Sequence, residues 1–372
     1  MLIGIPKEIK SYEHRVGMTP ASVREAVLAG NDVIVENNAG HIIGFDNSDY
    51  EAAGANISGS AADVFATADM IVKVKEPQTS EISMLRDGQV LFTYLHLAPD
   101  EAQTQGLLDS GCTAIAYETV TDSRGGLPLL APMSEVAGRM AVQAGARCLE
   151  IANGGRGVLL GGVPGVTPGK VVVIGGGVVG ANAIFVATGM GAQVTVIDRD
   201  IRRLAEIDTQ YKSLITTRFS NQTNIEEDVL SADLLIGAVL VPGAAAPKLV
   251  TTDMVKKMKR GSVVVDVAID QGGCFETSRP TTHDNPTYVV DDVVHYCVSN
   301  MPGSVARTST FALNNATLPF ALKIANLGVR EALISDPHLM EGLNIFEGKL
   351  TYRAVSVAQN RDFTPPQEAL HA

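Results

Sequence analysis

The sequence lacks an excess of basic side chains, and it also lacks fixed-period repeats and low-complexity tracts. Its 29 Lys and Arg residues are outnumbered by 41 Asp and Glu residues, which gives a formal net charge of −12. A chain this acidic has no electrostatic footprint for nucleic acid or for an anionic membrane, so we expect neither as a partner. Because 45% of the residues are hydrophobic, the chain can form packed cores, which excludes a disordered protein. Its 372 residues suggest roughly two domains.

Cysteine pairs are also missing. The four cysteines, Cys112, Cys148, Cys274 and Cys297, are far apart in the chain, and no two of them form a C-x-x-C motif. This spacing excludes a zinc ribbon, a redox dithiol and a disulfide scaffold, and we expect no metal site. The N-terminal segment meets a charge at Lys7 and contains no apolar core of a secretory signal. We therefore expect a cytoplasmic protein whose thiols are buried and unreactive.

Residues 171–197 carry no charged side chain over 27 positions. Such a run is long enough to cross a bilayer. However, it starts and ends with β-branched stretches, and three consecutive glycines at 175–177 interrupt it. A buried strand, a turn, a helix and a second buried strand would give the same pattern, and we prefer this interpretation.

Three of the glycines that follow the first of these stretches, Gly175, Gly177 and Gly180, form a G-x-G-x-x-G motif. The motif lies between a predicted strand and a predicted helix over 178–187, which is the context in which it binds a dinucleotide. Glycines let the backbone approach a pyrophosphate, and the helix N-terminus offers N–H groups and partial positive charge. The alternative is a glycine-rich turn that binds no cofactor.

The choice between NAD and NADP depends on Asp198, which ends the next predicted strand 18 residues beyond Gly180. Its carboxylate can accept hydrogen bonds from both adenosine ribose hydroxyls and would repel a 2′-phosphate, so NAD is favoured. Arg199, Arg202 and Arg203 weaken this preference, because an arginine could hold a 2′-phosphate.

Short apolar runs alternate with amphipathic stretches along most of the chain. The first strands are expected at 2–5, 32–36, 70–74, 90–95 and 114–117. A helix is expected from Ser134, as its N-cap, to about 152. A second series of strands is expected near residues 171, 194, 234, 263, 288 and 295. A helix over about 305–326, with Pro319 as a kink, follows where this rhythm stops.

This alternation predicts an α/β protein with two Rossmann-like, doubly wound domains. The residues after 304 are too few for a third domain, so we expect this tail to return to the first one. The NAD-binding domain, 131–304, would then be inserted into a discontinuous substrate domain made of 1–130 and 305–372.

Charged and polar side chains follow several predicted strands, where ligands bind in open α/β sheets. These residues are Arg15, Lys75, His96, Asp270 and Asn300. Arginine and lysine suit a carboxylate or carbonyl oxygen, while histidine and aspartate can carry protons. Singly, each residue could be a surface charge or a structural group, and Asp270 could simply cap a turn. Together they indicate a nicotinamide-dependent dehydrogenase of a small carboxylate, without saying whether its reacting substituent is hydroxyl or amine.

Several segments resemble one family, the alanine dehydrogenases and the related transhydrogenase α subunits. The matching segments are 4–8, 13–16, 19–20, 73–77, 94–98 and 132–138. The glycine loop at 175–180 and the segment 266–274 look like the dehydrogenase form rather than the transhydrogenase form. One departure is Tyr12, where the family signature often has Asn, and it makes the local loop conformation uncertain.

The resemblance implies a role for each candidate residue. Arg15 and Lys75 would bind the carboxylate and carbonyl end of the substrate, His96 would move the proton, and Asp270 would position ammonia or water. Asn300 is a candidate for both substrate and cofactor. The residues that would line NAD, besides the three glycines, are Ser134, Val178, Val179, Asp198, Arg203, Ser220, Val239, Leu240, Val267, Arg279, Val298, Asn300 and Met301.

The activity implied by the resemblance is reversible, NAD-dependent oxidative deamination of L-alanine to pyruvate and ammonium through an imine. Family members are commonly homohexamers, and no membrane partner is expected. Two alternatives remain open. One is an NAD-sensing or energy-coupling subunit, and the other is a dehydrogenase of another small acid such as glycine or glyoxylate.

Overall fold

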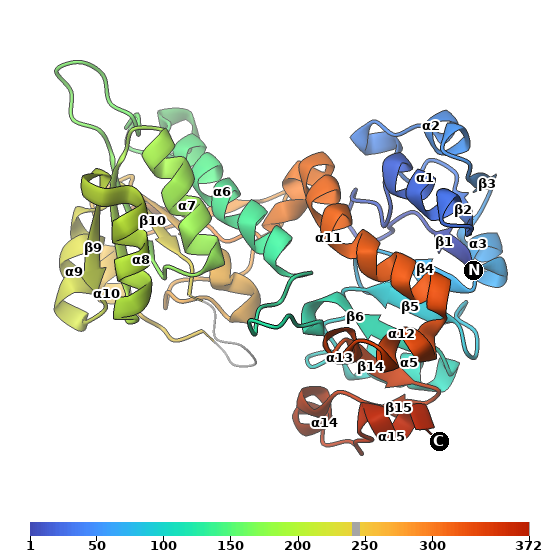
Figure 1. Ribbon diagram of the computed structural model, residues 1–372. Coiled ribbons are helices and arrows are strands. Elements are labelled where there is room, and N and C mark those ends of the chain that lie inside the picture. The colour runs from blue at the N-terminus through green and yellow to red at the C-terminus, as the bar shows by residue number, and fades with distance from the viewer. Residues whose placement is uncertain (240–245, 372) are drawn as a thin grey trace. The chain divides into compact units, whose positions relative to one another are not determined.

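The computed structural model describes residues 1–239 and 246–371. The chain divides into two compact units, one made of residues 1–133 and 305–372 and the other of residues 134–304. We call them the first unit and the inserted unit. In Figure 1 the blue, cyan and red parts of the chain make the first unit, and the green and yellow parts make the inserted unit.

The first unit is built on one mostly parallel sheet. Among the described residues its strand order is β15-β14-β6-β5-β4-β1-β2-β3. The strands are β1 (Leu2–Ile5), β2 (Asp32–Glu36), β3 (Asn56–Ser58), β4 (Met70–Val72), β5 (Val90–Thr93), β6 (Thr113–Ala116), β14 (Leu343–Phe346) and β15 (Lys349–Leu350). Strands β1 to β6 are parallel and follow the 3-2-1-4-5-6 order of doubly wound folds. The winding direction therefore reverses between β1 and β4.

The C-terminal tail completes this sheet. β14 pairs antiparallel with β6, and β15 pairs antiparallel with β14. The helices of the unit are α1 (Pro20–Leu28), α2 (Asn47–Ala52), α3 (Ala61–Thr67), α4 (Thr79–Ile82), α5 (Glu101–Ser110), α11 (Ala306–Leu327), α12 (Val329–Ile334), α13 (Pro337–Met340), α14 (Arg353–Gln359) and α15 (Pro366–His371). Pro319 lies inside α11. Helix α11 also binds the loop after β1, because Asn314 accepts from the Thr19 N–H at 2.6 Å.

The inserted unit has a second sheet, whose parallel strands follow the same order as those of the first sheet. Its order over the described residues is β12-β13-β11-β10-β7-β8-β9. The strands are β7 (Lys170–Ile174), β8 (Gln193–Asp198), β9 (Ile215–Phe219), β10 (Leu234–Gly237), β11 (Val263–Asp266), β12 (Thr287–Val290) and β13 (Val293–Tyr296). All neighbours are parallel except β12, which pairs antiparallel with β13. The winding direction reverses between β7 and β10.

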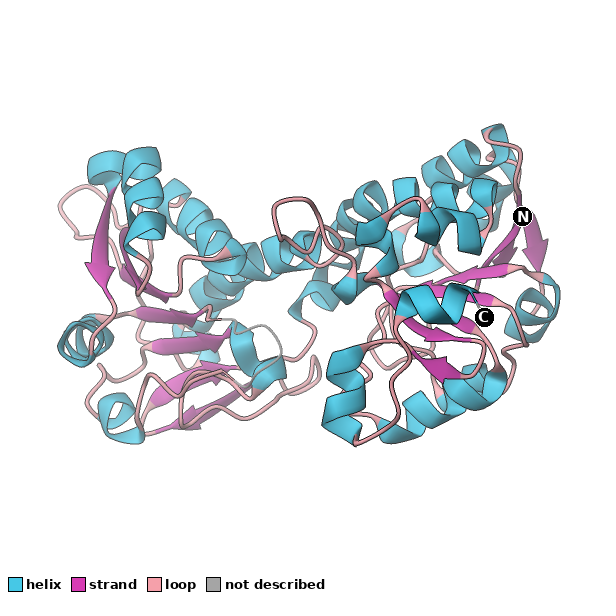
Figure 2. Cartoon of the chain, turned by 60° about the horizontal axis from the view of Figure 1, so that its bottom comes forward, coloured by secondary structure: helices cyan, strands magenta, loops and turns pink. Residues whose placement is uncertain are grey.

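Helices cover both faces of the second sheet. They are α6 (Ala131–Cys148), α7 (Val178–Gly189), α8 (Ile201–Tyr211), α9 (Gln222–Ser231) and α10 (Thr252–Lys256). Val171 and Val173 pack with side chains of α6, α7 and α8, whereas Val172 and Ile174 pack with those of α9 and α10. This alternation explains the uncharged β-branched run, because a strand buried on both faces has no solvent-facing position. Figure 2 shows the sheets, in magenta, flanked by helices.

The predicted fold class, two doubly wound α/β units of which one is inserted into the other, is confirmed. The uncharged run forms β7, α7 and β8, and no helix in the described residues is long and apolar enough to cross a membrane. The predicted start of a helix at Ser134 is wrong, because α6 begins at Ala131 and Ser134 lies within its first turn. Pro132 suits the second helical position, since its fixed φ is already helical.

Candidate functional site

Two of the predicted substrate ligands flank the point where the first sheet reverses its winding. Arg15 lies in the loop after β1, and Lys75 follows β4, the strand paired with β1. Because both strands run parallel, their carboxyl ends lie at the same edge of the sheet. Ligands of doubly wound folds bind at this position.

Arg15 is held in a buried ion pair. Its side chain is 2% exposed, and its Nε and Nη2 donate to the two carboxylate oxygens of Glu13 at 2.7 and 2.6 Å. Nη1 approaches the Met133 sulfur at 2.9 Å. Burial works to lower the pKa of Arg15, but the hydrogen bonds and charge of Glu13 outweigh it and raise that pKa above its ordinary value. The guanidinium is therefore fixed in orientation and always charged.

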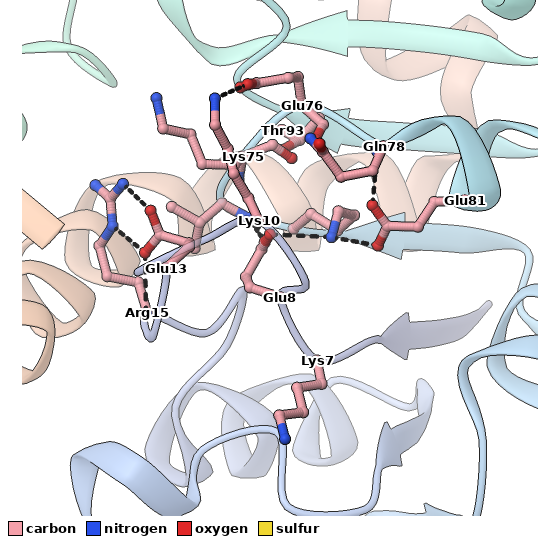
Figure 3. Close-up of polar contacts among 12 residues, drawn as sticks. Lys7, Glu8, Lys10, Glu13, Arg15, Lys75, Glu76, Gln78, Glu81 and Thr93 are labelled. Carbon is pink, nitrogen blue, oxygen red and sulfur yellow. Dashed lines mark hydrogen bonds and ion pairs between the residues drawn. The ribbon is translucent and has the colours of Figure 1, made fainter. Parts of the chain in front are cut away.

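Lys75 is anchored through its backbone. Its N–H donates to Glu8 Oε1 at 3.2 Å, and its carbonyl accepts the Thr93 hydroxyl at 2.9 Å. Figure 3 shows its side chain pointing away from Glu8. The next residue, Glu76, forms an ion pair with Lys10. Although burial alone would raise the pKa of Glu76, the charges of Lys75 and Lys10 bring it below its ordinary value.

His96 follows β5, the other neighbour of β4, and has a left-handed backbone with φ of 50°. Its N–H donates to Glu118 Oε1 at 2.6 Å, and the Leu95 N–H donates to both oxygens of the same carboxylate. The ring is stacked on Tyr94, with ring planes 3° apart and centroids 5.8 Å apart. The Tyr94 hydroxyl in turn donates to the Leu129 carbonyl at 2.6 Å. The imidazole is thus held from its backbone and from one ring face, while 46% of its side chain is exposed.

Tyr94 links the histidine to the arginine. Burial raises the pKa of Tyr94, and the nearby Arg15 charge works in the opposite direction. The first unit therefore brings together Arg15, Tyr94, His96 and Glu118. Sequence reasoning missed Glu13, Tyr94 and Glu118, although Glu118 has the same signal as the others, since it follows shortly after β6.

The glycine loop of the inserted unit has the geometry that its motif predicts. Gly175 has φ of 101°, and a Cβ there would lie 2.6 Å from the Ala238 carbonyl oxygen. A Cβ at Gly180 would lie 1.8 Å from the Gly175 carbonyl oxygen, whereas a Cβ at Gly177 would meet no atom within 4 Å. Two glycines are thus required by the fold, and Gly177 faces open space at the start of α7, where helix N–H groups have no partner within the helix. These residues fit a dinucleotide pyrophosphate.

Asp198 and Arg203 both bind this loop. Asp198 Oδ2 accepts the Gly176 N–H at 2.6 Å, and Arg203 Nε donates to the Gly176 carbonyl at 2.6 Å. Ser220 joins them, because its N–H donates to the Asp198 carbonyl at 2.9 Å. The structure therefore brings the predicted ribose ligand to the glycine loop.

The other predicted cofactor residues lie mostly after parallel strands of the same sheet. Val239 follows β10, Val267 follows β11, and Val298, Asn300 and Met301 follow β13. Because these strands run parallel to β7, their carboxyl ends lie at the same edge of the sheet as the glycine loop.

The remaining described residues that were predicted to line NAD do not directly follow strands of this sheet. Val178 and Val179 open α7, and Ser134 lies in α6, whose Gly138 packs against the Val179 carbonyl. Arg279 is exposed and its guanidinium lies 4.1 Å from the Tyr288 ring centre. Leu240 lies outside the described residues.

Asp270 is exposed in a short 3-10 helix, Val267–Gln271, that another carboxylate caps. Buried Asp266, at the end of β11, accepts the N–H groups of Ala268 and Cys274 at 3.1 and 3.0 Å and the Ser278 hydroxyl at 2.5 Å. Burial raises the pKa of Asp266 despite these bonds. The capping role considered for Asp270 therefore belongs to Asp266, which sequence reasoning missed.

Comparison with known proteins agrees with this arrangement. Residues 4–137 match the family model described as "Alanine dehydrogenase/PNT, N-terminal domain", and residues 141–353 match "Alanine dehydrogenase/PNT, C-terminal domain". The chain belongs to the alanine dehydrogenase/PNT family. This membership confirms the predicted family and, with it, the predicted class of enzyme, an NAD-dependent oxidoreductase.

Individual members of the alanine dehydrogenase/PNT family are similar over the whole chain. An alanine dehydrogenase of Halomonas elongata is 62% identical over 96% of both chains, and one of Methanococcus maripaludis is 56% identical over 100% of both. A solved L-alanine dehydrogenase has a TM-score of 0.94 and 53% identity, covering 97% of this chain and 99% of its own. A transhydrogenase from Sinorhizobium meliloti has a TM-score of 0.81 and 28% identity, covering 95% and 100%.

The departure from the family signature at Tyr12 also has a structural counterpart. Tyr12 has a left-handed φ of 59°, a conformation that asparagine adopts more easily than most residues. The loop nevertheless continues into the Glu13–Arg15 ion pair. The ion pair that orients Arg15 is therefore formed with Tyr at position 12.

Proposed function

We propose that the chain is an L-alanine dehydrogenase that uses NAD. The reaction converts L-alanine, NAD and water into pyruvate, ammonium, NADH and a proton. The observation that carries the proposal is that Arg15 and Lys75 follow the paired strands β1 and β4, where the first sheet reverses its winding, and that the exposed His96 follows the adjacent strand β5. A fixed guanidinium and an ammonium suit a small substrate that carries a carboxylate and a carbonyl or amino group.

When bound, NAD would supply the acceptor for the hydride that leaves the alanine Cα. Gly175, Gly177 and the first turn of α7 would hold its pyrophosphate, and Asp198 would hold its adenosine ribose. The Asp198 carboxylate lies at the Gly176 N–H, which supports NAD over NADP because a 2′-phosphate would meet its negative charge.

The side chains of the first unit bind the substrate and move protons. Arg15 binds the carboxylate, and Lys75 stabilises the negative charge that develops on the carbonyl oxygen. His96 takes a proton as water adds to iminopyruvate, and it returns a proton as ammonia leaves. For Asp270 we keep the role that the family resemblance implies, which is to position the water or ammonia.

The test is NADH formation by the purified protein, followed by absorbance, with a panel of L-amino acids and either NAD or NADP. We expect turnover with L-alanine and NAD. We also expect His96→Ala to abolish turnover while NADH still binds. Because the protein has no Trp, NADH fluorescence can be followed directly.

NADH binding without turnover of any amino acid would instead favour a sensing or coupling subunit. Turnover of glycine alone would change the proposed substrate. The predicted hexamer and cytoplasmic location stay predictions.

A further inference from the structure

A fully buried cluster of three charges lies beneath Lys75. The Lys73 ammonium is 3.0 Å from Glu8 Oε2 and 2.7 Å from Glu81 Oε1, and the three side chains are at most 2% exposed. Figure 3 shows Glu8 and Glu81 with the dashed contacts that join them through this lysine. Burial alone would lower the pKa of Lys73, but the two carboxylates raise it above its ordinary value, so the lysine is charged.

The two carboxylates differ in what their second oxygen does. Glu81 Oε2 accepts the Gln78 N–H at 2.8 Å, which caps the short helix α4. Glu8 Oε1 accepts the N–H groups of Val74 and Lys75 at 2.6 and 3.2 Å. The Glu8 carboxylate therefore contacts both the buried lysine and the backbone of Lys75, whereas the Glu81 carboxylate contacts the lysine and the backbone of Gln78.

Glu8 also connects the two substrate-binding segments. It lies in the loop after β1, the loop that carries Arg15, while Lys75 follows β4. The Lys75 carbonyl is fixed from the opposite direction by Thr93, at the end of β5. The peptide groups on both sides of the Lys75 Cα are thus bound to neighbouring strand ends, which sets the direction in which its side chain leaves the backbone.

We propose that Glu8 is a positioning residue that sets the direction of the Lys75 ammonium towards the substrate. The proposal rests on the proposed function in that Lys75 binds the substrate. Glu8 itself is buried and acts only through the Lys75 backbone. A displacement of about 1 Å in such a group can cost on the order of 100-fold in rate.

The matched pair Glu8→Gln and Glu81→Gln tests this proposal. Each variant removes one buried charge that binds Lys73, so both should lower thermal stability. An amide has one acceptor oxygen, so Gln at position 8 loses either Lys73 or the Val74 and Lys75 N–H groups. We expect Glu8→Gln to raise the KM for pyruvate and L-alanine at least about tenfold with an unchanged Kd for NADH, and Glu81→Gln to change the KM less than about twofold. Equal KM changes in the two variants would overturn the proposal.

A double-mutant cycle separates positioning from general destabilisation. If Glu8 acts through the Lys75 side chain, Glu8→Gln should have no further effect on KM in a Lys75→Ala background. Additive effects on KM would contradict the proposal.

A chemical readout keeps the proposal independent of turnover. The rate at which acetic anhydride modifies Lys75, measured by mass spectrometry on the full chain, should change in Glu8→Gln and stay at the wild-type value in Glu81→Gln. If the wild-type protein does not turn over L-alanine but Glu8→Gln still changes the labelling rate of Lys75, the proposed function is refuted and the positioning role stands. Unchanged labelling together with normal turnover would refute the positioning role alone.

Discussion

Single residues in this protein carry backbone strain where the chemistry is expected. His96 has a left-handed φ of 50°, a conformation that costs a non-glycine residue on the order of 1–3 kcal/mol. The Glu118 carboxylate offsets this cost, because it accepts the N–H groups of Leu95 and His96 together. Glu118 is therefore expected to fix the position from which His96 moves protons.

This reasoning predicts the effect of Glu118→Gln. The amide oxygen can still accept at the Oε1 position, but the amide nitrogen cannot accept the Leu95 N–H at the Oε2 position, and the negative charge that lies 3.8 Å from His96 Nδ1 is lost. We expect kcat with L-alanine to fall on the order of 10- to 100-fold, with an unchanged Kd for NADH measured by fluorescence. A loss of NADH affinity, or a kcat equal to that of the wild type, would show that Glu118 does not act through His96.

The sequence predicts the reactive residues better than the residues that hold them. Arg15, Lys75 and His96 could be found because each follows an apolar run that ends a strand. Glu8 and Glu118 also follow predicted strands, but the sequence does not indicate their partners, which depend on how separate loops meet: Glu8 binds Lys73 at a separation of 65 residues, and Glu118 binds His96 at 22. No local periodicity encodes such contacts.

At the scale of elements, the glycine loop contains two kinds of glycine. Some are required by the fold, and one is required by a ligand. Gly180 has no space for a Cβ, since the Gly175 carbonyl oxygen would lie 1.8 Å away. Gly177 has φ of −65° and ψ of −161°, which alanine can adopt, and a Cβ there would meet no atom within 4 Å. The two glycines should therefore respond differently to the same substitution.

We expect Gly180→Ala to lower the free energy of unfolding by about 1–3 kcal/mol, as overpacking does. Gly177→Ala should leave the unfolding midpoint unchanged and weaken NADH binding about tenfold or more, equal to ~1.4 kcal/mol, because its methyl group occupies space expected for the pyrophosphate. Urea unfolding and fluorescence titration measure the two effects. Full NADH affinity in Gly177→Ala would argue that the pyrophosphate does not bind at this loop.

Most of the strands that the sequence predicts are buried, although half-exposed β12 was predicted and buried β14 was not. Strands β7 and β8 are continuous β-branched runs. The glycine turn after β7 marks where this strand ends and where α7 begins. Strands β3 and β15 are only three and two residues long, and β9 is interrupted by polar Thr and Arg side chains. These strands owe their structure to pairing with a neighbour already in place, which a single-sequence pattern does not reveal.

At the scale of the whole molecule, the chain repeats one topology twice. Both sheets have parallel strands in the 3-2-1-4-5-6 order, and each unit has its own buried core. The insertion could be predicted because the last residues are too few to form a domain. The antiparallel pairing of β14 with β6 could not, since the direction of the returning strand depends on the path of the preceding helices.

Separate cores imply that a ligand should stabilise the unit that holds it. NADH at 100 times its Kd should stabilise the inserted unit by about 2.7 kcal/mol, which slows exchange by local unfolding about 100-fold. Hydrogen exchange followed by mass spectrometry should then show protection of amides in 134–304, including the glycine loop, with little change in 1–133. Pyruvate alone should protect the segments that carry Arg15, Lys75 and His96. Equal protection of both units by NADH would mean that the two cores unfold together. Only in that case does NADH binding to the inserted unit raise the free energy of opening of the first unit.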